Sequence, residues 1–204
     1  MTAAPRAVSR RERNKQEKLD RITAAARELF AERGVDDVTT QQIAERADIG
    51  AGTLFLYART KGELLLLVQN AAYEDALARG VQAADGVPDV VDAVMAVVRP
   101  VVECNRTHVD NGRTYLREMV FGDPTETHHA EALAIVGRTE AALADVLRRE
   151  VRPEQDAVAL AHVVSAVMFL AMAAPRDAAA TVDDVVEEVR RQVAVVLRNG
   201  TPAQ

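Results

Sequence analysis

The side chains best suited to bind phosphate groups gather in one stretch of the sequence, residues 39–64. Hydroxyl and ammonium groups commonly donate hydrogen bonds to phosphate oxygens, and a glutamine amide can reach either a phosphate or the edge of a base. The stretch carries these groups on Thr40, Gln41, Thr53, Tyr57 and Lys61. If the backbone brings them to one face, these residue types predict a surface that contacts a phosphate-rich partner.

The spacing within this stretch predicts two short helices and the start of a third. Thr39 and Gln42 have the spacing of a capping box, in which the two side chains satisfy free backbone N–H groups at a helix start. Gly50 follows the first helix and provides backbone freedom for a turn, after which a helix of about two turns is expected. Thr60 and Glu63 repeat the capping-box spacing and begin the third helix. Two short helices joined by a tight turn are typical of the helix-turn-helix, whose second helix enters the major groove of DNA.

At these positions the chain resembles the TetR family of bacterial transcriptional regulators. The matching pattern is R-I-x-x-A-A-x-x-L-F-x-E-x-G from Arg21, T-T-x-x-I-A-x-x-A from Thr39, G-T-L-F-x-Y from Gly52 and T-K-x-E-L from Thr60. It covers roughly the first third of the chain, about residues 21–64, and many positions match at fixed spacing. The remainder is similar only in length and helical character.

The resemblance implies an all-α fold of about nine helices. Its N-terminal part would be a three-helix helix-turn-helix domain, and its C-terminal part a helical bundle that dimerises through the last two helices. The expected division is a flexible basic arm over residues 1–14, a DNA-binding domain over 15–63 and a ligand-binding and dimerisation domain over 64–204. The implied function is a homodimeric, ligand-responsive regulator, usually a repressor, that binds a palindromic operator and is released by a small-molecule effector.

The family's DNA contacts are carried over by position to a defined set of residues. They fall on Thr40, Gln41, Gly50, Ala51, Gly52, Thr53, Phe55 and Tyr57, to which the ammonium group adds Lys61. For Phe55, DNA contact and core packing are equally good interpretations, whereas Leu54 is expected in the core. Many family members carry Ser in place of Gly50, Tyr in place of Phe55 and an aromatic residue in place of Ala58. The missing hydroxyls predict base recognition that depends on apolar contact and DNA shape more than on paired hydrogen bonds.

Charge is distributed unevenly along the 204 residues, whose net charge is −6. Residues 1–63 hold 12 Lys and Arg against 10 Asp and Glu, which leaves 13 against 21, a net −8, for the remainder. A basic first part on an acidic body is consistent with nucleic-acid binding at one end. The single Cys excludes an intramolecular disulfide, and no signal peptide is recognisable, so a cytoplasmic location is predicted.

The N-terminal residues 1–14 are Arg-rich and lack apolar periodicity, and either a solvated tail or an arm that follows phosphates fits them. The first firm helix is expected from about Lys15 to Arg33. Gly34 is placed to end it in the left-handed conformation, with Val35 packing back on Phe30.

Further helices are expected over about 61–80, 88–108, 113–121 and 125–150, with Pro100 kinking the second and Gly112 preceding the third. Residues 157–174 are apolar on all sides and just reach the length of a membrane span. Their Ala-rich composition, His162 and a mean hydropathy of −0.08 for the chain favour a fully buried helix, so no membrane partner is predicted. With the valine-striped last helix, it suits a four-helix dimer interface.

The resemblance also implies an effector pocket in the body, with Pro100 in its wall. The candidate lining residues are Val101, Cys104, Tyr115, Met119, Met168, Phe169 and Met172. Each of them also fits a plain core position. Because aromatic residues make up only 3% of the chain, an aliphatic or smaller ligand is expected rather than a large flat aromatic one.

Other chemistry has little support in the sequence. Cys104 and His108 share a helix face and His128 adjoins His129, yet nothing completes the three or four ligands of a metal site, and Cys104 has no partner for redox sensing. We therefore expect no metal, no cofactor and no enzymatic activity. Two alternatives stay open: an all-helical enzyme, disfavoured because no acid/base pair or nucleophile stands out, and a helical protein-interaction module or effector-binding bundle that has lost specific DNA binding. Salt-dependent DNA binding would distinguish both from a regulator.

Overall fold

The computed structural model describes residues 9–151, 153–174 and 179–200, and these residues form helices and no strands. The described helices, in chain order, are α1 (Arg10–Arg33), α2 (Thr40–Arg46), α3 (Ala51–Leu54), α4 (Lys61–Ala84), α5 (Val90–Arg106), α6 (Val109–Phe121), α7 (Thr127–Leu147), α8 (Glu154–Ala173) and α9 (Val182–Gly200). The predicted all-α class, with a helix-turn-helix domain before a helical bundle, is confirmed.

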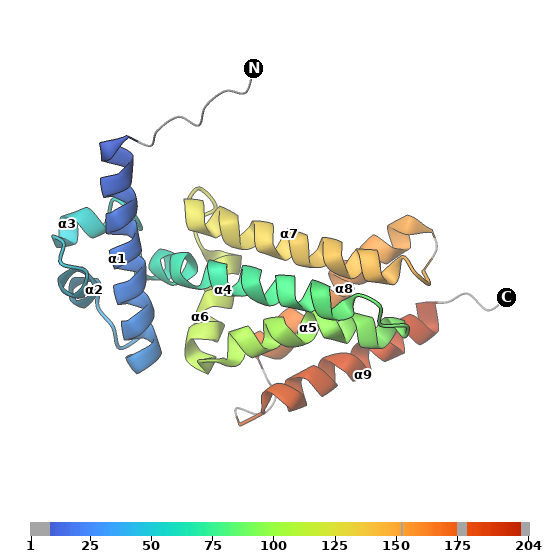
Figure 1. The fold of residues 1–204 in the computed structure, drawn as a ribbon. Helices are drawn as coiled ribbons and strands as arrows, with labels where there is room; N and C mark the ends of the chain where they lie inside the picture. Colours follow the sequence, from blue (N-terminus) through green and yellow to red (C-terminus); the bar gives the residue numbers. More distant parts are fainter. Residues whose placement is uncertain (1–8, 152, 175–178, 201–204) are drawn as a thin grey trace, which may run out of the picture.

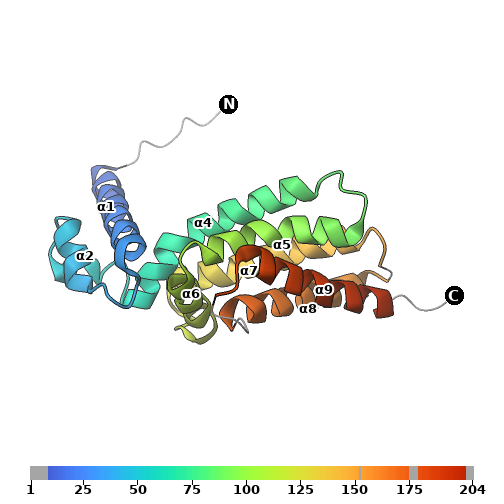
Figure 2. The ribbon, with the colours of Figure 1, turned by 90° about the horizontal axis from the view of Figure 1, so that it is seen from below.

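The molecule has a small head, α1 to α3, at one end of an elongated body (Figure 1). Helix α4 leaves the head and runs the length of the body, where it packs against α5, α6 and α7. Helix α6 lies across the end of the body that faces the head, and α8 and α9 lie side by side along one face (Figure 2). The head is therefore connected to the body through the start of α4 and through the nearby ends of α6 and α7.

Helix α1 begins at Arg10 rather than near Lys15. Ser9 accepts a hydrogen bond from the Glu12 backbone N–H, and the Glu12 carboxylate accepts one from the Ser9 N–H, so the two residues form a capping box. Sequence reasoning placed residues 10–14 in the flexible arm because they lack apolar residues. The cap starts the helix without any burial there. The rest of the predicted arm, residues 1–8, lies outside the described part of the chain.

The sequence suggested that Gly112 separates α6 from the preceding element. In the structure Gly112 lies inside α6. A Cβ atom at this position would lie 2.1 Å from the backbone oxygen of Asn105, at the end of α5. The missing side chain therefore permits a close approach of α5 and α6. Gly80 has the same role between α4 and α5, where a Cβ atom would lie 2.7 Å from the Val97 oxygen.

Helix α8 is not buried on every side, contrary to expectation. Val158 is 51% exposed and Leu170 is 64% exposed, although Val164 and Met168 are buried. By length and composition α8 could cross a membrane, a test that the core helix of a soluble protein also passes. The prediction of a fully buried helix was paired with a four-helix dimer interface, and the described residues of one chain cover only part of α8.

Candidate functional site

The turn between α2 and α3 has its unusual backbone at Asp48 and not at Gly50. Asp48 has a φ of 52°, in the left-handed region that Asp tolerates better than most residues, whereas Gly50 is extended with a φ of −69°. The Arg21 guanidinium lies 3.4 Å from the Asp48 backbone oxygen and 3.5 Å from its carboxylate. This exposed contact links the turn before α3 to α1.

Helix α3 has four residues, one turn rather than the expected two, and turn residues follow it. Leu54 is fully buried, as predicted, and fixes α3 on the head. Phe55 is 47% exposed, so the DNA-contact interpretation fits its position better than core packing does. Leu56 is 82% exposed. It was not among the predicted contact residues, because an aliphatic residue between two aromatic ones is usually assigned to the core. Two exposed apolar side chains, Phe55 and Leu56, therefore directly follow α3.

All nine predicted DNA-contact residues lie on the head or in the first turn of α4 and keep accessible surface. Several also have a partner within the chain. The Gln41 amide donates to Glu45 at 2.8 Å, the Lys61 ammonium donates to the Asp36 backbone oxygen at 3.1 Å, and the Tyr57 hydroxyl makes a long contact of 3.4 Å to the Lys15 backbone oxygen. Their role in DNA binding remains a prediction.

A cavity of about 190 Å³ lies in the body between α4, α5, α6, α7 and α8. Its lining comprises Tyr73, Val101, Tyr115, Leu116, Met119, Ala132, Ile135, Val136, Thr139, Glu140, His162, Ser165, Ala166, Met168, Phe169 and Met172. Six of the seven residues proposed from the sequence are among them, and Cys104 is not. The α7 residues were missed because a helical pattern alone does not tell which neighbour each face meets.

Cys104 is partly buried near the cavity's tyrosines without lining the cavity. Burial raises the pKa of the Cys104 thiol to about 11, so the group stays protonated at neutral pH. In the part of the chain that the structure describes, no cluster of three or more His, Cys, Asp or Glu side chains could hold a metal ion.

The polar atoms of the cavity's two tyrosines point to partners in the protein. The Tyr73 and Tyr115 rings stack with centroids 4.3 Å apart. The Tyr73 hydroxyl accepts from the Asn105 amide at 2.8 Å, and the Tyr115 hydroxyl donates to the Asn70 side-chain oxygen at 2.9 Å. Burial raises the pKa of both phenols above the ordinary value, so both stay neutral. Both rings therefore present mainly carbon to the cavity.

The start of α6 holds the end of α1. The buried Asn111 side chain accepts from the Val35 N–H at 2.7 Å and donates to the Phe30 backbone oxygen at 2.8 Å. Gly34 between them has a positive φ of 80°, but its ψ of 156° lies outside the left-handed helical conformation that the sequence predicted. These bonds satisfy backbone groups that the end of α1 leaves free, which joins the head to a helix that lines the cavity.

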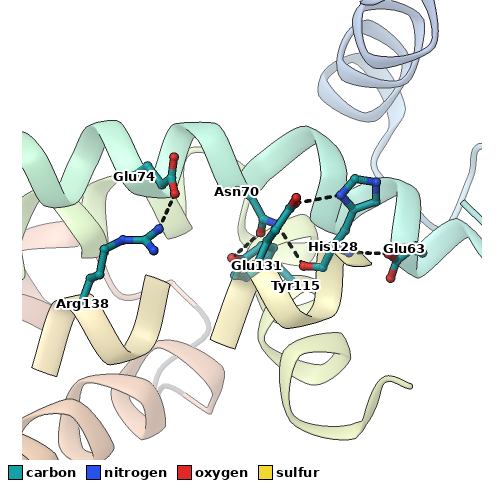
Figure 3. A network of polar contacts seen from close by, with 7 residues as sticks. All are labelled: Glu63, Asn70, Glu74, Tyr115, His128, Glu131 and Arg138. Atoms are coloured by element: carbon teal, nitrogen blue, oxygen red, sulfur yellow. Dashed lines mark hydrogen bonds and ion pairs between the residues drawn. The ribbon is translucent and has the colours of Figure 1, made fainter. Parts of the chain in front are cut away.

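The start of α7 holds the start of α4. The Thr60 hydroxyl accepts a hydrogen bond from the Glu63 backbone N–H, as predicted. The Glu63 carboxylate does not accept one from the Thr60 backbone N–H, so the capping box is incomplete. Glu63 is only 5% exposed, and its carboxylate accepts from the His128 backbone N–H at 2.8 Å (Figure 3). The capping-box prediction is wrong for this second half, because a long-range partner replaces the local one. Nearby, Arg59 forms an ion pair with Glu126 at 3.1 Å.

Asn70 connects these contacts to the cavity (Figure 3). Its side-chain oxygen accepts from Tyr115, and its amide donates to the His128 backbone oxygen at 3.0 Å and to Glu131 at 3.4 Å. The peptide groups of His128 therefore join Asn70 to Glu63, in the first turn of α4. A continuous series of hydrogen bonds runs from the cavity wall to the point where the head is attached.

Comparison with known proteins agrees with this architecture. The sequence model described as bacterial regulatory proteins, tetR family, matches residues 22–68. No curated protein sequence gives a significant match.

Solved structures share the fold over most of the chain. Thermus thermophilus FadR, a TetR-family transcriptional repressor in complex with lauroyl-CoA, superposes with a TM-score of 0.66 at 22% identity, over 91% of this chain and 96% of its own. A TetR-family transcriptional regulator from Streptomyces coelicolor gives 0.63 at 23% identity over 91% and 96% of the two chains. A transcriptional regulator from Rhodococcus gives 0.65 at 18% identity over 91% and 99%. The resemblance to the TetR family is confirmed, by sequence over residues 22–68 and by fold over most of the chain.

Proposed function

We propose that this protein is a homodimeric transcriptional repressor that binds a palindromic operator and releases it when a small apolar molecule enters the body cavity. The observation that carries the proposal is the hydrogen-bonded connection between cavity and head. Helices α6 and α7 both line the cavity, through Tyr115 and Ile135 for example. Helix α6 holds the head through Asn111, and the His128 N–H of α7 holds the first turn of α4, which carries the head. A ligand that displaces either helix would therefore act on the head directly.

DNA recognition would use α3 in the major groove and the start of α2 on the backbone. The exposed Phe55 and the accessible Ala51 suit contacts with thymine methyl groups. Thr40, Thr53 and Lys61 would contact phosphates, which fix the register of the head on the duplex. Two heads related by a two-fold axis would bind the two half-sites of a palindrome.

Dimerisation would cover the apolar surface that α8 and α9 leave exposed. Val158, Val163 and Leu170 on α8 and Val195 on α9 are each between 39% and 64% exposed. Two adjacent helices with such faces can pack against their symmetry mates as a four-helix interface. This pairing removes from water the same residues that make α8 resemble a membrane span.

The effector would be an uncharged molecule or an aliphatic chain. Apart from the Glu140 carboxylate and the His162 ring, which hydrogen-bond to each other at 2.9 Å, the lining is mainly aliphatic, Met and aromatic carbon. A cavity of about 150 Å³ suffices for benzene, so 190 Å³ suits a somewhat larger apolar group. The lauroyl-CoA in the Thermus structure combines an aliphatic acyl chain with a charged CoA group, so only its acyl chain resembles the proposed effector.

The test begins with selection of bound duplexes from a random DNA pool by the purified protein at moderate salt. We expect enrichment of a palindromic site, with binding lost when Tyr57 and Lys61 are both replaced by alanine. The enriched site then serves to screen apolar compounds for release of DNA. If no duplex is enriched, with or without metabolite extract, the regulator proposal fails and the protein-interaction module becomes the better interpretation.

A further inference from the structure

The first turns of α1 project beyond α3, along the side of the head where α3 lies (Figure 1). A groove separates them from the end of α3. Its lining includes Arg10, Arg11, Lys15 and Lys18 on one side and Leu56 and Tyr57 on the other. These α1 side chains are exposed, and no apolar packing accounts for the length of the helix here.

Three of the cations share one face of α1. Arg11, Lys15 and Lys18 are four and three residues apart, the spacing that places side chains next to each other on a helix. Like charges at this spacing repel and destabilise an isolated helix. Glu12, the acidic residue in the same groove, is engaged at the helix start, where its carboxylate accepts from the Ser9 N–H at 3.0 Å.

Three other cations of the head and the first turn of α4 are engaged by protein groups. Arg21 pairs with Asp48 and Arg46 with Glu28, at 3.5 and 3.0 Å, and the Lys61 ammonium donates to a backbone oxygen. Within the described residues, none of Arg11, Lys15 and Lys18 forms a salt bridge. Arg27 and Arg33, further along α1, also form no salt bridge among the described residues, but only Arg11, Lys15 and Lys18 share a face that lies beside the end of α3.

Two contacts place this face beside the end of α3. The capping box defines the start of α1, and the Tyr57 hydroxyl contacts the Lys15 backbone oxygen across the groove. The eight residues from Arg11 to Lys18 extend about 10 Å along the helix axis, at 1.5 Å per residue. Double-stranded DNA carries one negative charge per about 1.7 Å, so a face of this length can meet several phosphates.

We propose that this face, Arg11, Lys15 and Lys18, is a second DNA-binding surface that contacts the phosphates flanking each half-site while α3 occupies the major groove. This inference rests on the proposed DNA-binding function and adds the extent of the operator. The protein then requires duplex beyond the base pairs that α3 reads, and the flanking contacts carry no sequence preference.

The test compares the wild-type dimer with an R11Q/K15Q/K18Q variant on two duplexes, the selected palindrome alone and the palindrome extended by several base pairs on each side. A variant with the same charge change elsewhere, R27Q/R33Q/R79Q, is the control for net charge. All six positions are exposed, and thermal melting verifies that each variant is folded.

We expect the wild type to bind the extended duplex more tightly than the short one, and the α1 variant to bind both equally. Each phosphate contact contributes about 0.9 to the slope of log affinity against log salt, so six cations in a dimer contribute up to about 5. The α1 variant should lose that part of the slope but keep the wild-type order of preference among base substitutions in the palindrome.

Two results would overturn the inference, and they differ from failure of the proposed function. A slope and a flank dependence that match those of the control variant would show that α1 makes no phosphate contacts. A changed order of base preference would show that these residues read bases instead. If the wild type itself shows no salt-dependent DNA binding, the proposed function fails before α1 is tested.

Discussion

The head and the body of this protein bury different kinds of side chains. The described core of α1 to α3 consists of apolar side chains such as Ile22, Phe30 and Leu54. The buried polar side chains of the described chain all lie further on: Glu63, Asn70, Asn105, Asn111, Thr114, His129, Thr139 and Ser165. The head thus keeps its polar groups on the surface that would meet DNA, and the body keeps polar groups inside, around the cavity and against the head.

This difference has a physical consequence for each part. An apolar core packs at high density and favours one arrangement, which suits a surface that must match the major groove. Buried hydrogen bonds have specific partners, and losing a partner costs more free energy than a small shift in an apolar contact. Bonds such as those of Asn70 and Asn111 therefore favour discrete arrangements of α6 and α7, which suits a part that must respond to a ligand.

The largest expected effect comes from removing the centre of the head core. Phe30→Ala should lower the free energy of unfolding by about 3–5 kcal/mol, because a fully buried aromatic side chain leaves a cavity. The control Phe121→Ala removes the same group from a site that is 82% exposed and should change stability by less than about 0.5 kcal/mol. Urea unfolding and DNA binding measure both. Equal losses for the two variants would contradict the apolar head core.

Asn111→Ala tests the junction between the head and the body. The substitution leaves the Val35 N–H and the Phe30 oxygen without their partner, and each buried unsatisfied group costs about 1–3 kcal/mol. We expect a lower free energy of unfolding and faster hydrogen exchange at the Val35 amide. The exchange rates in the helices of the body should change less. Exchange at Val35 that stays at the wild-type rate would show that the bond does not hold the head. Asn14→Ala, at an exposed position of α1, is the matched control.

Filling the cavity should separate DNA binding from release. Ala132→Leu adds three carbon atoms to a fully buried lining position of α7, so apolar ligands should lose at least tenfold in affinity, about 1.4 kcal/mol, while operator affinity changes little. Ala130→Leu, on the exposed side of the same helix, is the control and should respond to ligand as the wild type does. Calorimetry and DNA-release assays measure the two affinities. Unchanged ligand binding in Ala132→Leu would place the effector site elsewhere.

Glu63 makes the junction sensitive to pH. Burial raises its pKa above the ordinary 4.5, so the folded protein binds the proton more tightly than the unfolded chain does. That stabilisation is complete below pH 4.5 and is lost as the pH rises through the folded-state pKa. Glu63→Gln keeps an oxygen for the His128 N–H without a titrating group. Relative to this variant, the wild type should therefore lose stability between pH 4.5 and neutral pH in urea unfolding. A difference that is constant with pH would contradict a raised pKa.

The smallest effect concerns the hydroxyl that many family members carry at the start of α3. A Cβ atom at Gly50 would lie 3.9 Å from the Thr53 hydroxyl, an ordinary contact, so Gly50→Ser should fold normally and stabilise the helix start by a few tenths of a kcal/mol. We expect slightly tighter operator binding and a sharper preference at one base pair, measured by competition with substituted duplexes. Weaker binding would show that Gly50 is needed for a close approach to DNA.

The head was largely predictable from sequence because its signals are local. The Thr39 capping box and the buried Ile43 and Leu54 follow from spacing within a few residues. The exceptions include the start of α1 and the length of α3. They also include Glu63, whose partner His128 is 65 residues away, and Asp48, which has the left-handed backbone that the sequence assigned to Gly50.

The body was less predictable because its determinants are long-range. Gly112 reads as a helix breaker until Asn105 is seen to pack against it, and Ala132 reads as ordinary helix until the cavity beside it is known. The exposed face of α8 could not be recognised from periodicity, since residues that contact a second chain are apolar in the same way as core residues. Sequence therefore indicated which residues were candidates for the pocket, and tertiary packing decided which of them meet.

Helices α6 and α7 both line the cavity and both contact the region where the head is attached, and this limits how the effector specificity of the protein can change. A substitution that admits another effector by displacing either helix would also alter the hold on the head, and with it the affinity for DNA when no effector is present. Helix α8 lines the same cavity through Met168 and Met172, but it packs on α5, α6, α7 and α9. Substitutions on α8 can therefore change which effector binds with little effect on the affinity for DNA. Among relatives that share an operator but respond to different compounds, sequence variation should be concentrated on that wall.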